Sequence, residues 1–224
     1  MGITNGMLQG FCTARLKVIG AGFESDIEWA EKLAHVLPTQ SYVLREHAWV
    51  VVNSGFKYTV ARKLWPALSD AFHQFRDAER IASFTDADRQ RALDVLGHER
   101  KIDAIIAMAD HVEEHGIEKI VADAATPLRL TRLPYIGKIT CWHLAKLLGA
   151  DVAKPDVHLG RAAMACSMTV EALCAGLARE AGTRITVVDS VLWRYGEQRL
   201  ARGWEDWPGL FCQPRAVKKE ASHG

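Results

Sequence analysis

Apolar residues recur three and four positions apart along most of this chain, and that spacing places them on one face of an α-helix. Gly, Pro and capping residues interrupt the pattern and divide it into helices of ordinary length. Helices are predicted over residues 25–36, 41–53, 59–71, 86–96, 100–115, 117–123, 157–164, 170–181 and 186–195. The expected fold class is therefore all-α.

The two ends of the chain follow this periodicity poorly. Residues 1–22 are rich in glycine, and we expect an irregular arm there with at most a short strand at about 14–19. Beyond Gly203 the sequence is aromatic and turn-rich, and it becomes polar after Pro214. We expect residues 213–224 to form a polar tail.

The stretch from Leu130 to Arg161 carries the clearest local signal. A helical pattern that starts at Thr126 and Pro127 breaks at Pro134, the chain turns at Gly137, and a second helical pattern follows at once. This order predicts a helix-hairpin-helix. We expect Gly137 to relieve the backbone of a tight turn, and the first N–H groups of the second helix to face outward as donors to an anion such as a nucleic-acid phosphate.

An acidic residue follows this hairpin at a short distance. Pro155 sets the backbone just before Asp156, so Asp156 is expected to begin a new helix as its N-cap or in its first turn. An aspartate in this position is most often only a cap. The alternative is a carboxylate positioned to face whatever the hairpin holds, and the combination of the two features favours that alternative.

Composition limits the kind of partner. The 224 residues carry a formal net charge of +1, so any contact with nucleic acid must be local. Basic residues are in excess around the hairpin, at Arg129, Arg132, Lys138, Lys146, Lys154 and Arg161. The five cysteines are scattered and read as reduced thiols, and no apolar run is long enough to cross a membrane. We expect a monomeric cytoplasmic protein without a metal or cofactor.

The hairpin and the acid together resemble the signature of the helix-hairpin-helix DNA glycosylase superfamily. Hairpin positions of that signature are matched by Leu133, Pro134, Gly137 and Thr140, and its catalytic-aspartate segment is matched by Asp156 and His158. The resemblance implies a single glycosylase domain over residues 1–224, a two-lobed helical fold with a central cleft, and double-stranded DNA with a damaged or modified base as substrate. Asp156 would be the catalytic residue, and Tyr135 and Lys138 would join the hairpin residues in binding DNA.

Two departures from that signature bear on chemistry. Tyr135 stands where many members have glycine, and Ile139 stands where members with lyase activity have lysine. Lys138 is one residue early and is rotated by roughly 100° around the helix. The resemblance therefore implies a monofunctional enzyme that leaves an abasic site. The alternatives are a bifunctional glycosylase and lyase that uses Lys138 or Lys154, and a non-catalytic DNA-binding module.

The turn after the predicted helix 41–53 is a second candidate for DNA contact. In the superfamily, the equivalent turn lends a side chain that fills the gap left by a flipped base, and Phe56, Lys57 and Tyr58 occupy that place here. The alternative is that Phe56 packs in the core and Lys57 is simply solvated.

Candidates for a base pocket are aromatic and polar residues, most of them near the hairpin and on the predicted helix 41–53. Aromatic side chains stack on extruded bases and polar ones read their edges. The aromatic candidates are Trp142, Trp49, Tyr58 and Trp193, the polar candidates are Glu46, His47 and Asn53, and Ile139 lies one turn from Trp142. Each aromatic candidate would otherwise belong to the core, and each polar one to the surface or the core.

Overall fold

The computed structural model describes residues 2–200 and 206–211, and all regular structure in these ranges is helical. The expected all-α class is confirmed, and each helix predicted from periodicity is present with bounds shifted by a few residues. The described chain divides into two compact units. Unit 1 combines the segment up to Glu31 with the segment from Pro155, and unit 2 is Lys32–Lys154.

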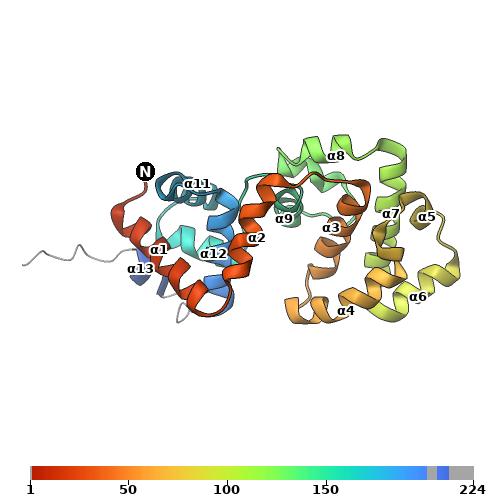
Figure 1. Ribbon diagram of the computed structural model, residues 1–224, viewed down its shortest axis with the longest axis horizontal. Helices are drawn as coiled ribbons and strands as arrows, with labels where there is room; N and C mark the ends of the chain where they lie inside the picture. The colour runs from red at the N-terminus through yellow and green to blue at the C-terminus, as the bar shows by residue number, and fades with distance from the viewer. Residues whose placement is uncertain (1, 201–205, 212–224) are drawn as a thin grey trace, which may run out of the picture. The chain divides into compact units, whose positions relative to one another are not determined.

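Unit 1 is assembled from both ends of the chain. Its helices are α1 (Asn5–Gly20), α2 (Glu24–Lys32), α10 (Val157–Ala165), α11 (Val170–Ala181), α12 (Ile185–Glu197) and α13 (Asp206–Phe211). Helix α12 is the centre of this unit, because it contacts α1, α10 and α11 (Figure 1). It is buried along nearly its whole length. The guanidinium of Arg194 on α12 binds the carboxylate of Asp26 on α2, with 2.7 Å between Nε and Oδ2.

The prediction of an irregular arm at residues 1–22 is wrong. Helix α1 fills most of that range, with Thr4 as N-cap accepting a hydrogen bond from the Met7 N–H. Its buried face recurs at helical spacing, but small residues hide the pattern in the sequence. Gly10 shows why, since a Cβ there would collide with the carbonyl oxygen of Leu210 on α13. The glycine allows two helices to approach closely and does not mark a loop.

The C-terminal end is described only in part. Residues 206–211, predicted to be turn-rich, form the short helix α13, and its Trp207 stacks on Phe211 and packs against Tyr195. The predicted tail at 213–224 lies outside the described residues. Cys12, Cys141, Cys166 and Cys174 are free thiols, as predicted for them.

Unit 2 contains the hairpin. Its elements are η1 (Leu33–His35), α3 (Gln40–Asn53), α4 (Tyr58–Ala71), η2 (His73–Phe75), α5 (Ala78–Ala82), α6 (Asp86–Leu96), α7 (Glu99–His115), α8 (Glu118–Asp123), η3 (Pro127–Arg132) and α9 (Thr140–Leu147). Helix α3 packs against both α7 and α9, between which it lies in Figure 1. Leu130, Leu133 and Ile136 are buried in the same core as α3, so the hairpin is part of the folded unit.

Candidate nucleic-acid interface

The predicted hairpin is present, but its first element is a 3₁₀-helix. Element η3 ends at Arg132, a loop follows, and α9 begins at Thr140. Leu133 and Ile136 are buried and anchor the loop, whereas Gly137, Lys138 and Ile139 are exposed.

Thr140 closes the turn. Its hydroxyl oxygen accepts a hydrogen bond from the Gly137 N–H over 2.7 Å, and the Gly137 carbonyl accepts from the Cys141 N–H over 3.0 Å. The side chain of Thr140 thus satisfies the first donor of the turn internally. Gly137 and Thr140, which both match the superfamily signature, are thus joined by a direct hydrogen bond.

Gly137 does not have the conformational role expected from the sequence. Its φ is not positive, and a Cβ built there would meet only the Thr140 hydroxyl at 3.8 Å. The left-handed residue of this loop is Tyr135, with φ of 62°. An L-residue with a bulky side chain in this region is strained by about 1–2 kcal/mol. The position at which the chain departs from the signature glycine is therefore the one that needs glycine conformationally.

The start of α9 keeps donors available to an anion. Ile139 is its N-cap and makes no side-chain cap bond. In the described part of the chain, the N–H groups of Lys138, Ile139 and Thr140 donate to no protein acceptor. Three neighbouring N–H groups at an exposed helix start, beside the ammonium of Lys138, match the requirements of a phosphate.

Helix α3 holds the hairpin at two points. The Tyr42 hydroxyl donates to the carbonyl oxygen of Leu147 over 2.9 Å, and burial raises the pKa of Tyr42 to about 12. The Nε2 atom of His47 lies 2.8 Å from the carbonyl oxygen of Pro134. A carbonyl only accepts, so Nε2 carries the proton. Burial lowers the pKa of His47 to about 4, and the bond to Pro134 acts in the opposite direction.

Sequence reasoning missed Lys101, which organises the turn after α3. Its ammonium donates to the carbonyl oxygens of Val52 at 2.9 Å and Ser54 at 2.6 Å, and burial lowers its pKa. These carbonyls belong to the end of α3, where a cation is favoured. The same ammonium lies 4.0 Å from the centre of the Phe56 ring. In the sequence, the only indication of this role is that the helical pattern of α7 places Lys101 next to a buried face.

The three turn residues expected to contact DNA have different surroundings. Phe56 is half-buried under Lys101, Lys57 is exposed, and Tyr58 is partly exposed at the start of α4. Tyr58 meets Trp49 edge to face at 6.1 Å between ring centres. Lys57 and Tyr58 are thus accessible to a ligand, and Phe56 supports the turn from within.

Several candidate pocket residues share one face of α3. Glu46, Trp49 and Asn53 are spaced by three and four residues and are all half-buried. Glu46 is not a surface residue as the alternative held, because its side chain is 12% exposed and Oε1 accepts from Arg45 at 2.8 Å. Burial raises the pKa of Glu46, and the bond with Arg45 partly offsets this shift. Trp142 is half-buried against the core of unit 2, and Trp193 lies in unit 1.

Asp156 begins α10 in unit 1, as predicted. Its Oδ1 accepts hydrogen bonds from the His158 N–H at 2.9 Å and the Leu159 N–H at 3.2 Å. The imidazole of His158 lies against α12, where a Cβ at Gly196 would come within 2.8 Å of Nδ1. Asp156 is thus a well-formed N-cap, and the carboxylate is fixed in position by the helix it starts.

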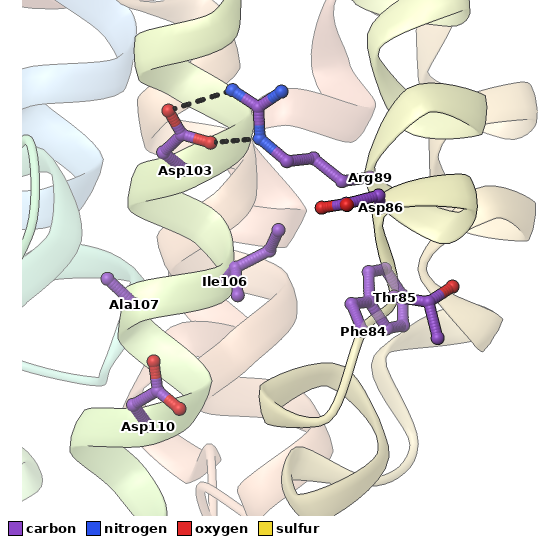
Figure 2. Close-up of a pocket in the computed structure, with 8 residues that line it drawn as sticks. All are labelled: Phe84, Thr85, Asp86, Arg89, Asp103, Ile106, Ala107 and Asp110. Atoms are coloured by element: carbon purple, nitrogen blue, oxygen red, sulfur yellow. Dashed lines mark hydrogen bonds and ion pairs between the residues drawn. The ribbon is translucent and has the colours of Figure 1, made fainter.

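A shallow pocket of about 230 Å³ lies on unit 2. It is lined by Phe84, Thr85, Asp86, Arg89, Asp103, Ile106, Ala107 and Asp110. Figure 2 shows Arg89 reaching across to Asp103, which it binds through two hydrogen bonds of 2.6 and 3.1 Å. The ion pair neutralises the charge of both groups, and no candidate from the sequence lines this pocket.

Comparison of the chain with protein-family models, with curated proteins and with solved structures finds no match. Across the ranges that the structure describes, each helix is too short or too polar to cross a lipid bilayer. Over the same ranges, no group of three or more His, Cys, Asp or Glu side chains is arranged to hold a metal ion.

Proposed function

We propose that the protein is a monofunctional DNA glycosylase, which flips a damaged or modified base from duplex DNA and hydrolyses its N-glycosidic bond. The observation that carries this proposal is the hairpin turn, in which Thr140 closes the loop and the next N–H groups stay available for a phosphate. The resemblance of the same residues to the glycosylase signature adds the chemistry. The hairpin belongs to unit 2, and Asp156 belongs to unit 1.

The reaction requires a negative charge beside the sugar. As the bond from C1′ to the base nitrogen breaks, its electron pair leaves with the base and positive charge develops on the sugar ring. A carboxylate that is already fixed stabilises this charge without reorganisation. The cap bonds of Asp156 supply that fixation. Water then adds to C1′ and gives its proton to the carboxylate or to the departing base.

The lyase alternative requires an amine that attacks the sugar. Ile139 occupies the slot of the lyase lysine and has no such group. Lys138 is exposed at the start of α9 and is the nearest amine in sequence. Borohydride added to a reaction with a duplex that the protein acts on is expected to trap no covalent adduct. An adduct that is lost in Lys138→Ala or in Lys154→Ala would establish the bifunctional enzyme instead.

A non-catalytic DNA-binding module is the second candidate. The observation in its favour is that Asp156 makes the two bonds of an ordinary N-cap, which a structural aspartate would also make. Such a module would bind DNA through the hairpin and would need no carboxylate at Asp156.

A panel of duplexes tests the proposal, with one alkylated, oxidised, deaminated or mismatched base in each. The protein is expected to create alkali-labile abasic sites in at least one duplex and no strand break before alkali. Binding to all duplexes with no abasic site in any would favour the non-catalytic module.

A further inference from the structure

A cluster of charges joins α8 to η3, directly before the hairpin loop. Asp123 is nearly fully buried, and its carboxylate faces three cations. Lys119 Nζ and Arg129 Nη1 each lie 3.7 Å from one of its oxygens, and Arg132 Nη2 binds the carboxylate directly.

Helix geometry explains why these residues meet. Lys119 and Asp123 are four residues apart on α8, so they share one face of that helix. Arg129 and Arg132 are three residues apart on η3, and side chains at that spacing are aligned in a 3₁₀-helix. Elements α8 and η3 pack together, so the two faces form one cluster.

The cluster has a surplus of positive charge. One carboxylate neutralises one cation, and Arg132 makes the closest contact with it. Lys119 and Arg129 remain as two like charges beside the same group, with side chains 59% and 65% exposed. Their mutual repulsion is unfavourable in the free protein, and an anion bound between them would remove it. On α7, burial is the main cause that lowers the pKa of His111, and the charges of His115 and Arg132 make smaller contributions in the same direction.

We propose that Lys119 and Arg129, oriented by Asp123, form a phosphate-binding patch, the 119/129 patch, that extends the hairpin interface along the backbone of duplex DNA. Arg132 ends η3 and Leu133 begins the hairpin loop, so the patch is continuous in sequence with the exposed turn. The inference rests on the DNA binding in the proposed function but needs no chemistry at Asp156.

The test is the salt dependence of binding to an undamaged duplex. Dissociation constants are measured by fluorescence anisotropy over a series of NaCl concentrations for the wild type and for Lys119→Gln/Arg129→Gln. The control is Arg80→Gln/Arg91→Gln, which removes two exposed charges from α5 and α6 of the same unit. Each lost phosphate contact reduces the magnitude of the slope of log association constant against log salt concentration by about 0.9. In the patch variant this magnitude is expected to fall by about 2, and in the control variant it should not change.

Thermal unfolding separates this role from a structural one. Asp123 keeps Arg132 in the patch variant, so its unfolding temperature is expected to be unchanged or higher. An unchanged slope overturns the inference, and a lower unfolding temperature with an unchanged slope assigns the cluster to joining α8 and η3 only.

Failure of the inference is distinguishable from failure of the proposed function. If the wild type releases a base but the patch variant shows no change in slope, the inference of a phosphate-binding patch is wrong and the proposed glycosylase function stands. If the slope changes as expected but no duplex loses a base, the phosphate-binding patch is supported and the proposed glycosylase function is wrong. Absence of duplex binding by the wild type overturns both.

Discussion

The buried imidazole of His47 donates a hydrogen bond from Nε2 to the carbonyl oxygen of Pro134, across 2.8 Å. This bond joins the middle of α3 to the loop of the hairpin. The ring is neutral, since burial lowers its pKa to about 4, and Nδ1 has no hydrogen-bond partner within the described chain. The position of the proposed phosphate site thus depends on a histidine held in one tautomer.

Acid is expected to destabilise the fold through His47. Between pH 6.5 and pH 4 the unfolded chain binds a proton at this ring and the folded chain does not, so the free energy of unfolding falls as pH falls. The loss approaches about 3 kcal/mol at pH 4. Urea unfolding at several pH values measures it.

His47→Gln is the control for this prediction. A glutamine amide donates to the Pro134 carbonyl but does not titrate. Burial also lowers the pKa values of His111 and His143, so the wild type and the variant must be compared at each pH. Parallel pH curves for the two proteins would contradict the assignment to His47.

Tyr135 is expected to prefer replacement by glycine over alanine. Both substitutions remove the ring, which His98 meets edge to face and Arg100 approaches at 6.0 Å. Only alanine keeps the steric cost of a φ of 62°. Tyr135→Gly is therefore expected to be more stable than Tyr135→Ala by about 1 kcal/mol. Equal stability, or the reverse order, would show that the backbone here is not strained.

Gly137 is expected to accept alanine, contrary to what the sequence predicts. With no positive φ and space for a Cβ, Gly137→Ala should leave stability unchanged or raise it by up to about 1 kcal/mol. Gly97→Ala is the matched control, because Gly97 ends α6 with a φ of 66° and should lose about 1 kcal/mol. A similar loss in both variants, measured by urea unfolding, would count against the described turn.

Lys101→Met is expected to lower the free energy of unfolding by about 2 kcal/mol, because the carbonyls of Val52 and Ser54 lose a charged donor while the aliphatic stem still packs. Lys63→Met on the exposed surface of α4 should change it by less than about 0.5 kcal/mol. Amide hydrogen exchange at residues 54–57 should rise in the first variant. Equal effects of the two substitutions would remove Lys101 from the support of this turn.

The sequence was sufficient for most helices and for the local form of the hairpin. Periodic apolar faces located the helices, and Asp156 after Pro155 located a helix start, because both are short-range properties. The glycines of residues 1–22 favour an irregular arm in the sequence, but Gly10 packs against Leu210, and that contact joins distant parts of the chain.

Long-range contacts also explain what was missed at the candidate site. Nothing near His47 or Lys101 in sequence indicates that one binds Pro134 and the other Val52. The role of Gly137 was assigned by its residue type, but the loop takes its positive φ at Tyr135. Glycine is the usual residue for such a backbone, and here the chain tolerates the strain in another residue.

We propose that the Asp156 carboxylate acts in base release in addition to capping α10. Asparagine caps a helix about as well as aspartate, so Asp156→Asn keeps the bonds to the His158 and Leu159 N–H groups and removes the charge. Its unfolding free energy and duplex affinity should therefore stay near those of the wild type.

The direct measurement is the single-turnover rate of base release by wild type and Asp156→Asn, on a duplex that the wild type cleaves to an abasic site. We expect a fall of about a hundredfold or more in the variant, because the developing sugar charge loses its carboxylate. Equal rates in the two proteins would contradict it and leave Asp156 as a helix cap alone.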